Sequence, residues 1–408
     1  CYPVPEKPVE IKAAPTKLAA RIGCDIDAAT MKAILENLDF TVEEKGEDSW
    51  VVTVPTWRKD CDCSADLSEE VARMYGYDKI ESKTPELIMA RGGQAPIEDV
   101  KDMIRDTLTG IGLDEVMTYS FYNAQVFDNL GLPADDSRRK ALQIINPISD
   151  DFRTIRTTLT PCLLSTVAYN QARQSERTAI FEVGRVFIPK TLPLTDFPEE
   201  KMVLAIAMSG KRNPLSWNTA KDAIDFYDIK GALEEVMDSL QVKGLSYGPT
   251  KEVFLHPGKS CAISYEGKVI GFMGAIHPTV QDRFGLSAET YVLEVEIAPF
   301  VKSAEQIPQF EHVPQFPSVS RDIAVVVKAG VSASDLEAEI RKEGGALLVD
   351  VRIFDVYTGK QVKSGYKSVA FNLTFQDVTR TLQDKDVDDV IKQIVANVQD
   401  KFGGMLRD

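Results

Sequence analysis

The amino-acid sequence predicts a multidomain α+β protein. Its 408 residues exceed what one ordinary hydrophobic core organises. Helical and strand-like patterns mix along the whole chain, and two Pro-containing stretches at residues 82–96 and 304–317 interrupt them. We therefore expect four parts: a small α+β domain at 1–84, a central antiparallel-sheet domain at 85–303, a linker at 304–314 and a ferredoxin-like domain at 315–408.

Composition and charge argue against several classes of protein. The hydrophobic content of 44% is typical of a folded chain, and no apolar run approaches the roughly 18 residues of a membrane span. The six Cys are scattered, which favours reduced thiols in a cytoplasmic protein. A net charge of -15 argues against a general nucleic-acid coat. From Phe316 onward 13 Lys/Arg stand against 14 Asp/Glu, so the C-terminal end is where we expect any RNA contact.

The first segment has the pattern of a small α+β domain. The expected strands are 9–12, 41–44 and 50–55. The expected helices are 15–22 and 27–38, the second with Asp27 as its N-cap. A further, acidic helix follows and ends near Gly76.

This acidic helix carries the densest group of candidate site residues. Asp60, Asp66, Glu69 and Glu70 lie within eleven positions, and the last three have the i, i+3, i+4 spacing that shares one helical face. One interpretation is a capped helix with a solvated acidic first turn, in which Arg73 pairs with a glutamate. The other is a site for a hard cation such as Mg²⁺, which prefers oxygen ligands. The spacing alone favours the first interpretation.

The central segment predicts a large antiparallel sheet backed by helices. An amphipathic helix covers 97–111, with Val100, Ile104 and Leu108 on one face. The further expected helices are 160–173 and 227–240. The expected strands are 115–121, 142–146, 179–188, 202–209, 261–265, 269–276 and 289–297.

The last segment has the order strand, helix, strand, strand, helix, with one more short strand expected. This order matches the ferredoxin-like βαββαβ pattern. Arg321, Lys360, Lys363 and Arg380 are its candidate RNA-binding residues, because cations near exposed aromatic side chains suit phosphates and unpaired bases. Surface lysines over a core of aromatic residues explain the same pattern equally well.

Three groups of residues resemble one family. Arg58-x-Asp60-x5-Asp66-Leu-x-Glu69-Glu70-Val-Ala-Arg-x-Tyr-Gly-Tyr77 resembles the B5 domain of the phenylalanyl-tRNA synthetase β subunit family, of bacterial type. The central run Phe152-Arg-Thr-Ile-Arg156 and the motifs around Asp225–Gly231 and His277-Pro278 resemble its catalytic-like core. Phe316-Pro-x-x-x-Arg321-Asp322 and Leu373-Thr-Phe-Gln376 resemble its anticodon-binding domain. The resemblance covers almost the whole chain.

The resemblance implies a role for each segment. Asp60, Asp66, Glu69 and Glu70 match residues that hold Mg²⁺ at the contact with the α subunit, and with the resemblance the metal interpretation becomes the favoured one. Asp62 lies outside that pattern and is expected to be surface charge. The family implies an α2β2 heterotetramer, a tRNA for phenylalanine as partner, no membrane contact, and ATP bound by the α subunit rather than by this chain. Complete β subunits of the family are about twice as long. We therefore expect a C-terminal half, without the editing domain.

No catalytic residue is expected in this chain. Synthetases of this class need a Gly-rich strand followed by an arginine to hold ATP. In this chain Gly271-x-x-Gly274 is followed by His277-Pro278 instead of that arginine. We expect Arg153 and Arg156 to pair with acids at an interface rather than to hold ATP. The function predicted is thus the non-catalytic part of a phenylalanine–tRNA ligase. The alternatives are a stand-alone nucleic-acid-binding or scaffold module and a carboxylate metal-dependent hydrolase.

Overall fold

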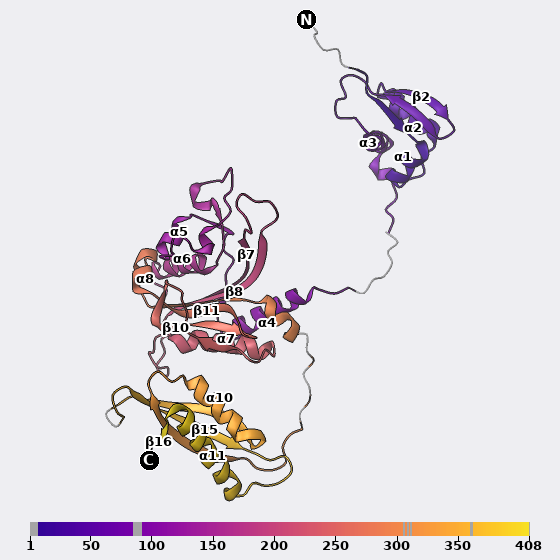
Figure 1. Ribbon diagram of the computed structural model, residues 1–408. Coiled ribbons are helices and arrows are strands. Elements are labelled where there is room, and N and C mark those ends of the chain that lie inside the picture. Colours follow the sequence, from indigo (N-terminus) through magenta and orange to yellow (C-terminus); the bar gives the residue numbers. More distant parts are fainter. Residues whose placement is uncertain are drawn as a thin grey trace. The chain divides into compact units, whose positions relative to one another are not determined.

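The computed structural model describes residues 7–84, 92–304, 307, 310, 312–359 and 362–407 (Figure 1). The chain divides into two compact units, Cys1–Gln94 and Ala95–Asp408. Buried hydrophobic clusters of the described residues lie in 11–71, twice in 100–300, and in 323–398. The multidomain α+β class is thereby confirmed, while both expected linkers fall partly outside the described residues. In the described ranges no helix combines the length and the apolar character needed to cross a lipid bilayer.

The N-terminal unit packs helices against a three-stranded antiparallel sheet of order β1-β3-β2. The strands are β1 (Glu10–Ala13), β2 (Thr41–Gly46) and β3 (Ser49–Thr53). The helices are α1 (Pro15–Ile22), α2 (Ala28–Asn37) and α3 (Ser64–Tyr75), followed by a 3-10 turn at Tyr77–Lys79. The predicted N-cap of α2 is confirmed, because Thr30 N donates to Asp27 Oδ1 at 2.8 Å. Gly76 ends α3 at a φ of 105°, which glycine adopts without strain.

The central part of the second unit is built on a seven-stranded sheet of order β4-β7-β8-β12-β11-β10-β9. All neighbouring strands are antiparallel except β4 and β7. The strands are β4 (Asp114–Glu115), β7 (Arg177–Ile188), β8 (Glu199–Gly210), β9 (Ser246–Gly248), β10 (Leu255–Tyr265), β11 (Lys268–Ile276) and β12 (Thr290–Glu296). The large antiparallel sheet that the sequence predicts is confirmed.

Helices cover both faces of this sheet, and alternate side chains of each central strand enter different cores. On β8, Leu204, Ile206 and Met208 contribute to one core, and Val203, Ala205 and Ala207 to the other. The first core also holds residues of α4 (Pro96–Gly110), α7 (Phe226–Ser239) and the turn Ala298–Phe300, which precedes α9 (Val301–Ala304). The second holds residues of α5 (Gln125–Asn129), α6 (Thr160–Gln171) and α8 (Pro278–Phe284). Burial on both faces explains why the central strands read as continuous apolar runs.

Two strands expected from the sequence are wrong. At 115–121 only the first residue, the end of β4, joins the large sheet; Thr118 then bonds through its backbone N–H and hydroxyl to the Glu182 side chain. At 142–146 a single bridge, Gln143 to Thr154, takes the place of a strand. Both runs have the alternation of a strand, but each forms only a few backbone hydrogen bonds to a neighbouring segment, such as Val116 N–H to Phe181 O and Ile144 N–H to Arg153 O. Short strands β5 (Phe121–Tyr122) and β6 (Thr154–Ile155) pair beside them.

The C-terminal part is a four-stranded antiparallel sheet of order β14-β15-β13-β16 with two helices (Figure 1). The elements are β13 (Val319–Lys328), α10 (Ala333–Gly344), β14 (Leu348–Tyr357), β15 (Tyr366–Phe375), α11 (Asp384–Phe402) and β16 (Met405–Leu406). The predicted ferredoxin-like order, including the last short strand, is confirmed. Alternate residues of β15, such as Phe371 and Leu373, are fully buried in the core that both helices share.

Candidate functional site

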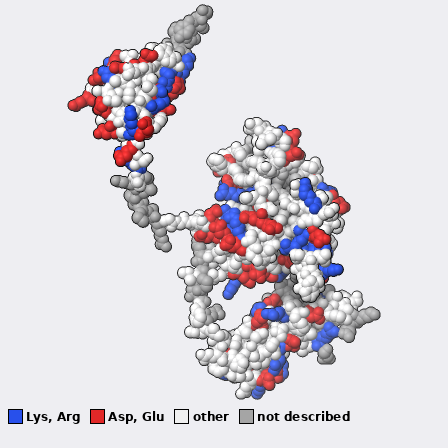
Figure 2. Space-filling view, turned by 180° about the vertical axis from the view of Figure 1, so that it is seen from behind, with Lys and Arg blue, Asp and Glu red and all other residues white. Residues whose placement is uncertain are grey.

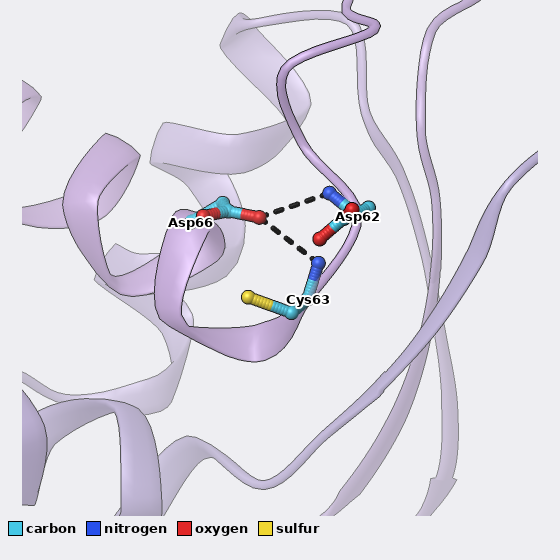
Figure 3. A group of neighbouring side chains, drawn as sticks. All are labelled: Asp62, Cys63 and Asp66. Carbon is cyan, nitrogen blue, oxygen red and sulfur yellow. Dashed lines mark hydrogen bonds between the residues drawn. The ribbon is translucent and has the colours of Figure 1, made fainter. Parts of the chain in front are cut away.

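Asp66 lies at the N3 position of the acidic helix α3, whose N-cap residue is Cys63. Leu67 and Val71 bury one face of this helix in the N-terminal core. The Oδ2 atom of Asp66 accepts the backbone N–H groups of Asp62 and Cys63, each at 2.9 Å (Figure 3). These hydrogen bonds hold the pKa of Asp66 below its usual value, and the bond from Asp62 has the largest effect. The capping interpretation therefore describes Asp66 as it lies in the structure.

Arg58 joins two other candidate ligands. Its guanidinium donates to the Glu70 carboxylate through Nη1 and Nη2, each at 2.9 Å, and to Asp60 at 2.7 Å. Arg73 donates to the same Glu70 carboxylate at 2.5 Å. The hydrogen bonds from Arg58 lower the pKa of Glu70 and of Asp60 to about 2. Glu70 is buried, with 6% of its side chain exposed, and its charge is matched by two cations.

Glu69 is exposed and faces a different neighbourhood. It lines a hollow of about 370 Å³ between α1 and α3, together with Arg21, Ser68 and Tyr77. Of the four predicted ligands it is the one without a recorded hydrogen bond or ion pair to the described residues. It therefore offers both carboxylate oxygens to a partner.

The four carboxylates fit a magnesium ion in part. Carboxylate oxygens are ligands of the right chemistry, and Mg²⁺ often takes only one or two of them beside water. Asp60, Asp66 and Glu69 have solvent access, whereas Glu70 is already neutralised by Arg58 and Arg73. Within the described ranges, the group of three or more potential ligands whose atoms all lie within 4.8 Å of one another is a different one, Asp62, Cys63 and Asp66 (Figure 3). Those three make the helix cap. A metal at the predicted set remains a prediction.

The sequence predicts one ion pair of this site and not the two that Arg58 forms. The pairing of Arg73 with a glutamate one turn earlier is confirmed for Glu70. Arg58 was assigned no contact, although it stands two residues before Asp60. That proximity was the available signal, but the link from Arg58 to Glu70 spans twelve residues and depends on the fold. Asp62, expected to be surface charge, contributes its backbone N–H to the cap of α3.

In the central domain, Arg156 is enclosed by the protein. Its Nη1 atom donates to Glu182 at 2.7 Å, with 5% of each side chain exposed. The same atom donates to the Thr118 hydroxyl, and Nε donates to the Arg185 carbonyl oxygen at 2.7 Å. The expected pairing of Arg156 with an acid is confirmed, but the pair is enclosed within the central domain and does not lie at an interface. Since three neighbours use this guanidinium, it is a structural group in this fold.

Arg153 and the glycines of β11 also have local explanations. Arg153 forms an exposed ion pair with Asp150 at 3.0 Å, as expected of an acid-paired arginine. A Cβ atom on Gly271 would lie 2.2 Å from the carbonyl oxygen of Glu294, and one on Gly274 would lie 2.7 Å from that of Lys259. Close approach of neighbouring strands therefore requires both glycines.

The candidate RNA-binding residues lie at two opposite ends of the C-terminal sheet. In the strand register Val319 pairs with Phe375 at one end, and Lys328 pairs with Tyr366 at the other. Arg321 and Arg380 lie at the first end and bond to the start of α11, at Asp384 and Asp386. Lys363 lies in the β14–β15 loop at the other end, 5.9 Å from the Tyr366 ring centroid. Lys360 lies outside the described residues.

Large apolar side chains stand exposed on the central domain. Met117, Ile145 and Ile148 are 92%, 97% and 99% exposed. Met117 also lines a hollow of about 390 Å³, together with Tyr119 and Phe152, whose rings meet edge to face at 5.2 Å. Exposed apolar side chains of this size indicate a surface that meets another macromolecule.

Family models match three consecutive parts of the chain. The model of the tRNA synthetase B5 domain matches residues 11–77. That of the phenylalanyl tRNA synthetase beta chain CLM domain matches residues 80–297, and that of the ferredoxin-fold anticodon binding domain matches residues 314–407.

Relatives match along the same length. The phenylalanine–tRNA ligase beta subunit of Clostridium acetobutylicum is 33% identical over 407 residues, 100% of this chain and 50% of the relative. The beta subunit of Vibrio cholerae is 38% identical over 98% of this chain and 50% of its own length. The beta subunit of Symbiobacterium thermophilum is 40% identical over 84% of this chain and 38% of its own length. The chain thus spans half or less of the length of these relatives. A solved pyrrolysyl-tRNA synthetase from Desulfitobacterium hafniense aligns with 51% of this chain and 68% of its own, at 12% identity and a TM-score of 0.40.

Proposed function

The chain belongs to the phenylalanyl-tRNA synthetase β chain family, and from this membership we propose that it is a non-catalytic part of a phenylalanine–tRNA ligase. It supports an α subunit, which binds ATP and attaches phenylalanine to its tRNA. The observation that carries the proposal is the order of three matched domains, B5, CLM and anticodon-binding, over nearly all 408 residues. An α2β2 heterotetramer in the cytoplasm is the assembly we propose for the intact protein.

Each part has a proposed task. The ferredoxin-like domain contacts the anticodon end of the tRNA, with Arg321, Arg380, Lys363 and Lys360 as candidate contacts. Because Arg321 and Arg380 lie at one end of the sheet and Lys363 at the other, one group of them contacts the anticodon and the other contacts the flanking backbone. The exposed apolar side chains of the central domain support a contact with the α subunit. The enclosed Arg156 supports the absence of ATP chemistry in this chain.

The proposal is tested by mixing the purified chain with the α subunit of a phenylalanine–tRNA ligase. We expect a stable complex in size-exclusion chromatography, and formation of phenylalanyl-tRNA only when both are present. Failure of the two to associate at micromolar concentration would contradict the proposal. A chain that attaches phenylalanine without an α subunit would contradict it as well.

We propose that Asp60, Asp66 and Glu69 hold a Mg²⁺ ion at the contact with the α subunit, with Glu70 positioned by Arg58 beside them. The ion would screen the mutual repulsion of these carboxylates and accept ligands from the partner. The accessible oxygens of Glu69 and Asp60, together with the resemblance of the motif, support this assignment. In the absence of the ion, Asp60, Asp66 and Glu70 keep the contacts described above.

The double substitution Asp66→Asn with Glu69→Gln tests the metal site. We expect the dissociation constant of the complex with the α subunit to rise about tenfold or more in Mg²⁺, equivalent to about 1.4 kcal/mol, and to lose its dependence on Mg²⁺. Titration calorimetry with and without EDTA measures both. The matched control, Glu43→Gln with Glu47→Gln, removes two exposed charges of the same unit and is expected to change neither. Unchanged, Mg²⁺-dependent assembly of the first variant would remove the metal from the account.

A further inference from the structure

Three cations of the N-terminal unit gather around one hollow. Lys12, Lys17 and Arg21 line a hollow of about 330 Å³, together with Ser49 and Ser64. None of the three forms a recorded hydrogen bond or ion pair with the described residues. We call this site the basic hollow.

Most other cations of the unit are engaged. Lys32 and Lys45 pair with glutamates, Arg58 and Arg73 bind Glu70, and Lys83 donates to a backbone carbonyl. Residues 7–84 carry 11 Lys/Arg against 16 Asp/Glu, so a surplus of positive charge does not explain the gathering. In Figure 2 the Lys and Arg atoms of this unit lie mainly along one side of it, while both signs are interspersed over the other parts of the chain.

Secondary structure holds the three cations in place. Lys17 and Arg21 stand at i and i+4 on α1 and therefore share a helical face. Lys12 alternates on β1 with the buried Ile11 and Ala13, so its side chain leaves the opposite face of the strand. The backbone positions of the three cations are thus fixed before any ligand arrives, so binding has to order only their side chains.

One carboxylate, Asp48, also lines the hollow, and its charge interacts with that of Lys17. Thr16 donates to Asp48 through its backbone N–H at 3.0 Å and through its hydroxyl, which holds this carboxylate in place without removing its charge. Three cations against one carboxylate leave the hollow with a surplus of positive charge, which attracts an anion. A guanidinium fork, two ammonium groups and two serine hydroxyls match the oxygens of phosphate groups.

We propose that the basic hollow binds backbone phosphates of an RNA strand. The choice of RNA rests on the proposed function, because tRNA is the polyanion that such a ligase handles. An acidic peptide is the competing ligand, but peptides gain much of their affinity from apolar side chains, and the apolar wall of the hollow is largely withdrawn. Leu18, its largest apolar residue, is only 1% exposed.

The test compares two triple variants of the full chain. The first, Lys12→Gln, Lys17→Gln and Arg21→Gln, neutralises the basic hollow. The second, Lys32→Gln, Lys45→Gln and Lys79→Gln, removes three other charges of the same unit. Fluorescence anisotropy with labelled tRNA between about 50 and 200 mM salt gives the dissociation constant and its salt dependence. Circular dichroism checks that both variants are folded.

We expect the first variant to bind tRNA about tenfold more weakly at low salt. The plot of log affinity against log salt concentration has a negative slope. In the first variant this slope should become less steep by about 2, because three phosphate contacts are lost. The control is expected to change by less than about threefold. Equal losses in both variants, an unchanged first variant, or a wild-type chain that binds no tRNA would each overturn the proposal.

Two further arms separate the possible failures. In the first arm, poly-glutamate and unlabelled RNA compete with the labelled tRNA at equal concentrations of charge. If poly-glutamate competes equally strongly, the hollow is assigned to acidic peptides and the RNA assignment is overturned. Attachment of phenylalanine to tRNA by the wild-type chain with an α subunit tests the proposed function itself. If that reaction proceeds while the basic-hollow variant keeps the wild-type KM for tRNA, this inference alone is wrong.

Discussion

Replacing Glu182 by Ala is expected to lower the free energy of unfolding of the central domain by about 3–5 kcal/mol. The substitution leaves the guanidinium of Arg156 buried without its counter-ion, because only 5% of each of the two side chains is exposed. It also removes the acceptor of the Thr118 hydroxyl and backbone N–H. An uncompensated buried charge is more costly than the loss of an exposed pair.

The same hairpin offers a matched control. Arg185 and Glu200 pair across β7 and β8 at 3.1 Å, but 57% and 49% of their side chains are exposed. Glu200→Ala is expected to cost at most about 1 kcal/mol. Hydrogen exchange of the β7 amides in increasing urea measures both variants without assuming that the whole chain unfolds in one step. Equal effects of the two substitutions would show that burial of the Arg156–Glu182 pair adds nothing to the stability cost of removing one partner.

Glu294 of β12 is expected to be the second most sensitive position. Its Oε2 atom accepts four hydrogen bonds at the start of α6, from the Thr158 hydroxyl, the Leu159 N–H, and the hydroxyl and N–H of Thr160. Glu294→Ala leaves these buried donors unsatisfied and should cost about 3 kcal/mol or more. Glu294→Gln retains an acceptor oxygen and should cost about 1 kcal/mol. Glu289→Ala, at an exposed carboxylate near the start of the same strand, is the control.

The Glu294→Gln variant also reports on pH. Burial raises the pKa of Glu294 above its ordinary value near 4.5. Between that value and the raised pKa the folded state binds more protons than the unfolded state, so the stability of the wild-type chain falls as pH increases. The amide does not titrate. We therefore expect the stability difference between wild type and Glu294→Gln to narrow as pH rises from about 4.5, and a constant difference up to pH 8 would contradict this.

The sequence was most informative where apolar periodicity was long. β8 and α7 end within three residues of their expected bounds, because their patterns persist over three or more turns or across a whole buried strand. The expected strand at 115–121 failed for the opposite reason. Its alternation is real, but the backbone pairing with β7 ends at Val116, whose N–H donates to the Phe181 carbonyl oxygen, and Met117 and Tyr119 are exposed. Periodicity does not reveal how far a pairing with a neighbouring strand extends.

The sequence predicted which residues of the site lie close together along the chain, but not which of their side chains contact one another. The spacing of Asp66, Glu69 and Glu70 placed them on one helix, which is confirmed. Their expected common face is wrong, because Glu70 is buried against Arg58 and Arg73 whereas Glu69 is exposed. The bonds from Arg58 to Glu70 depend on how the loop before α3 returns to the helix. The split of the RNA candidates depends on strand register, which sets Arg321 and Lys363 at opposite ends of one sheet.

The central claim is that this chain supports an aminoacylation reaction whose chemistry another subunit performs. The most direct measurement is phenylalanine-dependent ATP–pyrophosphate exchange by the purified chain, alone and after addition of an α subunit. We expect no exchange above background for the chain alone, and exchange once the α subunit is added. Exchange by the isolated chain, persisting after removal of every trace of α subunit, would contradict the account.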